Sequence, residues 1–308
     1  WLSKTDDLNN FEVGKQDDSA LALTLSTTTQ NRICWLMAQS SRLLLGTADA
    51  EWAVSGGQGV MTPTNARADN HGFVGSSDVP ALMATDKVLY IERGGGRVYQ
   101  YGYDYESDGY VSRDLTVFAD HVLADGGGCR DIAFIRKPEP RAVFVRRDGQ
   151  LALMTYNSMH QVNAWHRYTT DGTFEGVAAL PNGDKADLLF ALVVRDDGRF
   201  IEVQAPDNEF QDPDGRDYVS TLVTCSLTPP RDARKGHGAQ VMMCLRSETP
   251  VEGVMVSSDG DAWSELDRYG LLPAGWDTLV SDGAWDFDVR GGVRVTGNRG
   301  FELLALRW

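Results

Sequence analysis

The densest group of side chains that could act on a ligand lies in Tyr101–Tyr110, "YGYDYESDGY". Four tyrosines there alternate with the carboxylates of Asp104, Glu106 and Asp108. Carboxylates flanked by aromatic rings can form a glycosidase pair or a platform on which a sugar stacks. A strand followed by an acidic turn, with half-buried tyrosines, is favoured because no second carboxylate motif supports hydrolysis. The alternative, a glycan platform, would consist of Tyr101, Tyr103, Asp104, Tyr105 and Glu106.

A second candidate is the segment Glu51–Pro80, where a strand-like start passes into a long run rich in Gly, Ser, Asn, Thr and Pro. Long loops of this kind are often functional. The glycines at 56–59 could cradle a phosphate only if a Lys-Ser/Thr pair and a helix followed, and neither does. We expect instead a loop and outer-strand crossing between structural units that contacts a neighbouring subunit. Its candidate contact residues are Gly56, Gly57, Gly59, Thr62, Pro63 and Asn65.

No catalytic, cofactor or metal site can be named from the remaining polar residues. The acidic segment Asp207–Asp217 lacks the spacing of an EF-hand, so a solvated linker is expected and calcium binding is the alternative. The histidines show no H-E-x-x-H spacing, and His166 is expected to be packed or hydrogen-bonded. No G-x-S-x-G elbow occurs. We therefore predict a protein that is not an enzyme and has no cofactor.

Four cysteines are spread widely along the chain, at Cys34, Cys129, Cys225 and Cys244. None forms a C-x-x-C pair, so a zinc site is not expected. Buried free thiols in a reducing compartment are the predicted state.

The elements that would position these residues are short β-rich runs separated by turn residues. Four strand–turn–strand units have their turns near Asp49, Gly95, Asp148 and Asp197, which is a repeat of about 50 residues. Asp-Gly between apolar runs is a hairpin signal, since type I′ turns need positive φ at both central residues. A repeat of this length with several strands per unit predicts β-propeller blades. The number of blades stays open.

The repeat ends after about residue 206 and alternating apolar runs resume at Tyr218. We predict propeller blades over 1–217 and a smaller β-sandwich-like, platform-type domain over 218–308. The one helical candidate is a short stretch at Ser264–Leu271. "SSDGDAW" at Ser257–Trp263 approaches the Asp-box of sialidase propellers, with the Asp–Trp spacing one residue short; such a box braces a hairpin and says nothing of catalysis.

Composition narrows the function classes. Hydrophobic residues make up 42% and charged residues 24%, which is typical of a globular protein. The formal net charge of -15 argues against a surface that grips phosphate backbones, because nucleic-acid affinity comes largely from clustered Lys and Arg. It is compatible with DNA that slides past an acidic wall. No apolar run is long enough to span a membrane.

Five stretches of this sequence resemble one family, the tail nozzle (tail tubular protein B-like) proteins of bacteriophages and prophages. They are "NRICWLMAQSSRLLLGTADAEWAVSG", the stretch from "MTPTNARADNHGFVGSSDVP" to "TVFADHVL", "DIAFIRKPEPRAVFVRRDGQLALMTYNSMHQVNAWHRYTTDGTFEGVAALP", "YVSTLVTCSLTPP" and "GAWDFDVRGGVRVTGNRGFELLALRW". The start "WLSKTDDLNNFE" resembles a segment that normally lies well inside a longer protein of this family. The resemblance weakens in the last 90 or so residues outside the two stretches quoted.

The resemblance implies a β-propeller with a platform-type domain in a virion structural protein. Subunits of the family form a ring, commonly a hexamer, that meets the portal, adaptor and tail fibre proteins and conducts the genome during ejection. It implies location in the phage tail, and in the host cytoplasm during assembly, with weak affinity for duplex DNA. The alternative from the residues themselves is a carbohydrate-binding or glycan-cleaving propeller that reads a receptor.

Overall fold

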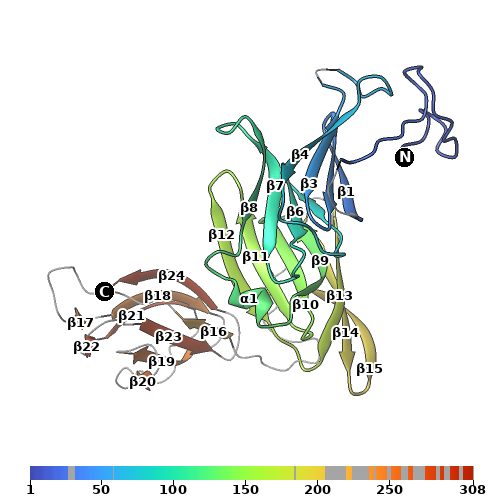
Figure 1. Ribbon diagram of the computed structural model, residues 1–308. Helices are drawn as coiled ribbons and strands as arrows, with labels where there is room; N and C mark the ends of the chain where they lie inside the picture. The colour runs from blue at the N-terminus through green and yellow to red at the C-terminus, as the bar shows by residue number, and fades with distance from the viewer. Residues whose placement is uncertain are drawn as a thin grey trace. The chain divides into compact units, whose positions relative to one another are not determined.

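The protein is almost entirely β-structure in the computed structural model, with strands β1 to β24 and one helix, α1 (His121–Ala124), among the described residues (Figure 1). An all-β fold is thereby confirmed. The structure describes residues 1–26, 32–57, 59–183 and 185–204, and after these only the strands named below. The chain divides into two compact units, Trp1–Pro206 and Asp207–Trp308. The division falls somewhat before the boundary expected near Asp217.

The first unit contains four successive antiparallel sheets, each a meander in sequence order. Sheet 1 is β1 (Ile33–Gln39), β2 (Arg42–Thr47), β3 (Glu51–Ser55) and β4 (Arg67–Gly72). Sheet 2 is β5 (Leu82–Ala84), β6 (Lys87–Ile91), β7 (Val98–Asp104) and β8 (Gly109–Asp114). Sheet 3 is β9 (Cys129–Ile135), β10 (Arg141–Arg146), β11 (Leu151–Asn157) and β12 (Val162–Tyr168). Sheet 4 is β13 (Thr173–Leu180), β14 (Leu188–Arg195) and β15 (Gly198–Gln204).

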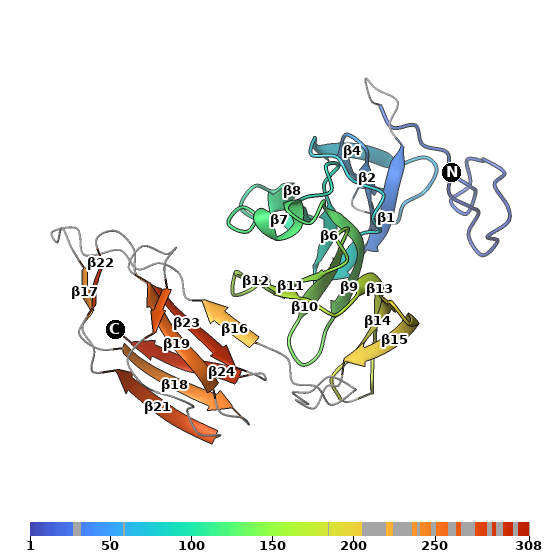
Figure 2. The ribbon, with the colours of Figure 1, turned by 90° about the horizontal axis from the view of Figure 1, so that it is seen from below.

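The sheets stack face to face because their central strands are apolar on both sides. In "RAVFVR" (β10), Phe144 faces the core shared with sheet 2, while Val143 and Val145 face the core shared with sheet 4. Side chains of successive residues point to opposite faces of a strand, so a continuous apolar run fills two cores at once. A third core, with Trp35 and Tyr101, joins sheets 1 and 2. Figure 2 shows sheets 3 and 4 side by side. The three cores show that neighbouring sheets stack on one another. A propeller, in which the stack closes into a ring of blades, stays a prediction.

The predicted hairpin turns are present, but their backbone differs from the type I′ expectation. In the β10–β11 turn only Gly149 has positive φ, at 83°, whereas Asp148 does not. Arg146 N donates to Gln150 O at 2.8 Å and Gly149 N donates to Arg146 O at 3.0 Å. A turn of three residues needs a single left-handed position, which the glycine supplies.

The second unit consists of antiparallel strands whose side chains are not described. One sheet has the order β16-β23-β19-β20, another the order β21-β18-β24, and β17 pairs with β22. The strands are β16 (Ser220–Val223), β17 (Gly236–Gly238), β18 (Val241–Ser247), β19 (Val251–Ser257), β20 (Trp263–Glu265), β21 (Gly275–Ser281), β22 (Trp285–Phe287), β23 (Gly292–Gly297) and β24 (Phe301–Arg307).

Three sequence-based predictions concern this region. The helix predicted at Ser264–Leu271 is wrong at its start, since β20 extends to Glu265 and pairs with β19. Ser257 pairs with Trp263, so a hairpin does join these strands, while the turn of the "SSDGDAW" segment lies outside the described residues. The acidic segment Asp207–Asp217 also lies outside them.

Candidate functional site

The connections between strands divide the first unit into two ends. In an antiparallel meander, the turn between the second and third strands lies at the same end as the crossing to the next sheet. We call this the turn end; it comprises the turns at 48–50, 92–97 and 147–150 and the crossings 73–81 and 115–128. In Figure 1, α1 marks the turn end, and the β7–β8 hairpin lies at the opposite end. Residues far apart in sequence therefore meet at the turn end.

One backbone hydrogen bond recurs in sheets 1 to 3 at the turn end. In each case a residue early in the turn donates its N–H to a carbonyl of the segment that leads into the same sheet. The bonds run from Ala48 N to Arg32 O (3.0 Å), from Arg93 N to Gly75 O (3.1 Å) and from Arg147 N to Gly128 O (2.9 Å). Arg93 and Arg147 thus occupy equivalent positions, which points both side chains out of the same end of the stack.

Two glycines let each crossing pack onto the turn of the preceding sheet. Gly75 has φ 76°, and a Cβ there would lie 2.2 Å from Ala48 O. Gly128 has φ 97°, and a Cβ there would lie 2.9 Å from Gly95 O. Only glycine fits a left-handed backbone at such close approach. These contacts fix the crossings, and with them the residues that follow each glycine.

A buried carboxylate adds a second hold on the first crossing. Glu51 on β3 has no exposed surface, and Gly75 N donates to its Oε1 at 2.9 Å while Val74 N donates to its Oε2 at 3.3 Å. Burial, opposed by these hydrogen bonds, raises the pKa of the Glu51 carboxyl above its ordinary value. The folded protein therefore holds this proton to higher pH than the unfolded chain does. Stability from this group is full below the unfolded pKa and is lost as the pH rises through the folded pKa.

We predict that Glu51→Gln reduces the loss of stability on raising the pH. Between about pH 4.5 and pH 8 the wild-type free energy of unfolding should fall relative to that of the variant, since only the wild type must ionise a buried carboxyl. Urea unfolding across this range measures the difference. Parallel curves for the two proteins would contradict the assignment.

The turn end carries a pocket of about 680 Å³ that draws its walls from sheets 1, 2 and 3. Four arginines and one aspartate line it, although the whole chain has a net charge of -15. The lining residues are Arg32, Ala48, Ser76, Ser77, Asp78, Val79, Arg93, Cys129, Arg130 and Arg147. The pocket is therefore a local concentration of positive charge on an acidic protein.

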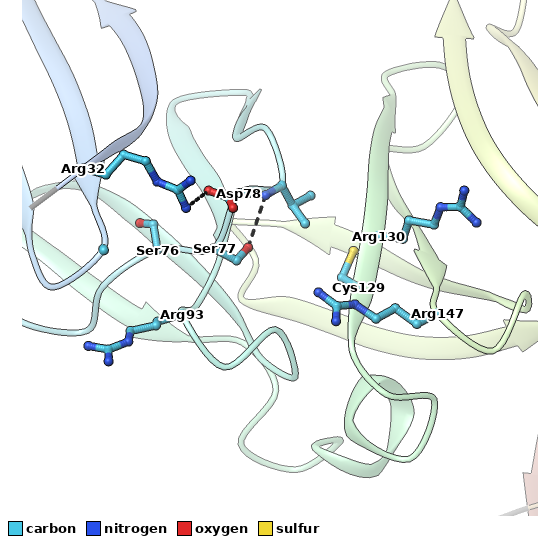
Figure 3. Close-up of a pocket in the computed structure, with 10 residues that line it drawn as sticks. Arg32, Ser76, Ser77, Asp78, Arg93, Cys129, Arg130 and Arg147 are labelled. Carbon is cyan, nitrogen blue, oxygen red and sulfur yellow. Dashed lines mark hydrogen bonds and ion pairs between the residues drawn. The ribbon is translucent and has the colours of Figure 1, made fainter.

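Figure 3 shows how the charged side chains lie in this pocket. The Arg32 guanidinium extends to the Asp78 carboxylate and pairs with it, and the Arg147 guanidinium extends toward the pocket from the opposite side. Arg93 pairs with Asp49, and the Arg130 side chain points away from Asp78. Arg147 forms no ion pair with another residue in the part of the chain that the structure describes. Its charge faces the pocket unneutralised.

The floor of the pocket is less polar. Val79 is buried, and Ser76 Oγ accepts a hydrogen bond from Trp35 Nε1 at 2.8 Å. Cys129 has no exposed surface; burial raises the pKa of its thiol to about 12, and Sγ donates to Asp131 O at 3.3 Å. A neutral thiol of this kind is not a nucleophile. Cys129 thus agrees with the predicted buried free thiol, whereas Cys34 is half-buried.

The predicted contact loop lies at the end of sheet 1 away from the pocket. It joins β3 to the outer strand β4, and the later part of the segment Glu51–Pro80 belongs to the crossing 73–81 that leads to sheet 2. The strand β4 itself, in the polar "RADNHG", has no apolar alternation that the sequence could show. Asn65 orders the loop: its Oδ1 accepts from Thr62 N at 2.7 Å and its Nδ2 donates to Val60 O at 3.0 Å.

The structure divides the predicted glycan platform. Tyr101 has no exposed surface and packs between sheets 1 and 2, so it cannot meet a sugar. Tyr103 is 39% exposed and Tyr105 90% exposed, both at the β7–β8 hairpin. The Asp104 carboxylate already accepts a hydrogen bond from Ser107 Oγ (2.9 Å) and pairs with Arg113 (2.7 Å).

The histidine singled out in the sequence, His166, is half-buried against Tyr168, and burial lowers the pKa of its imidazole.

Comparisons with known proteins give only distant likenesses. No protein-family profile matches this chain, and no curated protein matches it. A luciferin-regenerating enzyme matches with 16% identity and a TM-score of 0.37, over 57% of this chain and 62% of that one. An exo-beta-1,3-galactanase from Phanerochaete chrysosporium matches with 8% identity and a TM-score of 0.29, over 87% and 79%. A glycoside hydrolase matches with 10% identity and a TM-score of 0.28, over 87% and 83%.

These findings bear on the prediction that the chain is not an enzyme. The three solved structures named above are enzymes, so that prediction is corrected and withdrawn. At these TM-scores the likenesses assign neither an activity nor a substrate to the chain. Within the described residues, no helix is long and apolar enough to cross a membrane, and no group of three or more His, Cys, Asp and Glu could hold a metal ion.

Proposed function

We propose that this chain is part of a bacteriophage or prophage tail nozzle subunit. The observation that carries the proposal is that separate stretches of the family resemblance pack against one another at one place. Trp35, Gly46 and Ser76 come from "NRICW", "LLLGTADAEW" and "GSSDV". Trp35 Nε1 donates to Ser76 Oγ at 2.8 Å, and a Cβ on Gly46 would lie 2.2 Å from Trp35 Nε1. The sequence segments that resemble the family thus pack together where β1, β2 and the 73–81 crossing meet.

The stacked sheets suit a subunit of a conduit. Each is an antiparallel meander whose turns and loops lie at its two ends, where loops commonly contact neighbouring molecules. In this proposal the subunits form a ring, with the loop at 56–66 among the contacts between subunits. The acidic composition lets DNA pass without being held.

The test is assembly of the complete protein that contains this chain. We expect rings in size-exclusion chromatography with light scattering, and binding to portal–adaptor complexes of the same phage. A protein that stays monomeric at high concentration and also fails to join portal–adaptor complexes would rule the proposal out. The isolated chain is the wrong object for this test, because ring contacts can come from other segments.

A second candidate function is glycan binding or glycan cleavage by the same first unit. It is favoured by the two exposed tyrosines at the β7–β8 hairpin, Tyr103 and Tyr105, because exposed aromatic rings are surfaces on which sugars stack. A glycan array and a panel of chromogenic glycosides, run with wild type and Tyr105→Ala, test it. A signal lost in the variant supports this function, and clean negatives on both retire it.

A further inference from the structure

We propose that the arginine-lined pocket at the turn end binds a doubly charged phosphate group, as inorganic phosphate or as the phosphomonoester of a small molecule. This inference does not depend on the nozzle proposal. It rests on the lining of one pocket, and nothing in the predicted site residues anticipated it.

Charge is the first argument. Four arginines surround the pocket and one carboxylate, that of Asp78, lies among them. Asp78 pairs with Arg32 and Asp49 pairs with Arg93, which leaves Arg130 and Arg147 without an ion pair among the described residues, and of these two Arg147 extends toward the pocket. Guanidinium groups match the oxygens of phosphate in geometry as well as charge. A dianion gains more from this lining than a single carboxylate does.

Position is the second argument. The Arg147 backbone is fixed by its bond to Gly128 O, and the Arg32 carbonyl accepts the equivalent bond from Ala48 N. The two side chains enter the pocket from opposite sides (Figure 3). Between them, Ser77 Oγ accepts from Val79 N at 3.4 Å and keeps its own hydrogen to donate. Arg32, Ser77 and Arg147 thus supply the pocket with hydrogen-bond donors from three separate segments of the chain.

The surroundings favour a small ligand over a nucleic acid. The floor of the pocket includes the buried side chains of Val79 and Cys129, so the charged groups lie around its rim and not at its base. The volume of about 680 Å³ lies in the range of small-molecule sites. Duplex DNA would bring many phosphates against a chain of net charge -15, whereas a single phosphomonoester meets only the pocket.

Asp78 competes with the ligand for Arg32. An incoming phosphate must draw the Arg32 guanidinium away from this carboxylate or share it, and it is also repelled by the carboxylate. Asp78→Asn should therefore tighten phosphate binding by a few-fold, the modest effect expected when an exposed ion pair is removed.

The experiment is calorimetric titration of the whole chain at low salt with inorganic phosphate, a sugar 1-phosphate and a short DNA duplex. We expect saturable binding of phosphate or of the sugar phosphate. Arg147→Gln should weaken it about tenfold or more, as expected for loss of a charge-assisted hydrogen bond. Arg113→Gln is the matched control, since Arg113 is exposed, paired with Asp104 and on β8, outside the pocket lining; it should bind as wild type does.

Comparison of the three titrations identifies the kind of phosphate that the pocket binds. Binding of inorganic phosphate alone indicates a free-phosphate site, and tighter binding of the sugar phosphate indicates a phosphomonoester site. No binding at millimolar phosphate, or equal weakening in Arg113→Gln and Arg147→Gln, would overturn the proposal. Duplex binding that is tighter than phosphate binding and is lost in Arg147→Gln would also overturn it, by making the pocket a nucleic-acid contact.

Discussion

Replacing Phe144 by alanine is expected to lower the free energy of unfolding of the first unit by about 3–5 kcal/mol, the usual cost of emptying a buried aromatic position. Phe144 has no exposed surface, and its ring centroid lies 5.3 Å from that of Trp165. The ring fills the core between sheets 2 and 3, so its loss leaves a cavity in the stack itself. Urea denaturation of the chain, followed by tryptophan fluorescence, measures the change.

Phe118→Ala is the control for this measurement. Phe118 is 99% exposed on the crossing between sheets 2 and 3, so its truncation should change stability by less than about 0.5 kcal/mol. The same substitution, Phe→Ala, is then expected to cost much stability at the buried position and little at the exposed one. Similar small changes in both variants would show that the sheets do not stack through the core around Phe144.

The second large effect is expected at Gly75, where alanine should cost about 2–5 kcal/mol. The left-handed backbone accounts for about 1–2 kcal/mol. The clash of a Cβ with Ala48 O, at 2.2 Å, adds about 1–3 kcal/mol because backbone must move. Equilibrium unfolding measures the change, and because the crossing also carries Ser77, a proposed donor to the phosphate, the folded variant should bind phosphate more weakly than wild type does.

Gly95→Ala separates the two contributions to the Gly75 effect. Gly95 has φ 82° in the neighbouring β6–β7 turn, but a Cβ there would meet nothing within 4 Å. Gly95→Ala should lower the free energy of unfolding only by the cost of placing alanine in a left-handed backbone, about 1–2 kcal/mol. Equal losses in Gly75→Ala and Gly95→Ala would contradict the close packing of the first crossing onto the β2–β3 turn.

Much of the first unit follows from local sequence. The turns near Asp49, Gly95, Asp148 and Asp197 were predictable because Asp and Gly interrupt apolar runs at a regular interval. The apolar character of "VLYI" and "AVFV" likewise anticipates strands buried on both faces. By contrast, α1 escaped prediction, since a helix of four residues has no periodicity to detect.

The candidate site was not predictable in the same way. Arg32, Arg93 and Arg147 each resemble a solvated turn residue in sequence, and only the stacking of three sheets brings them to one pocket. One signal was present: aligning "IERGGG" with "VRRDG" places Arg93 and Arg147 at the same turn position. Glu51 shows the same limit, because the N–H groups that hold its carboxylate belong to Val74 and Gly75, which lie on the crossing to the next sheet.

The most direct test of the proposed function is immunogold electron microscopy of phage particles released by the organism that encodes this chain, using antibodies raised against the chain. A nozzle subunit places the label at the tail, below the portal vertex, on intact particles. Particles that carry full tails and no label there would contradict the proposal that this protein is part of the virion.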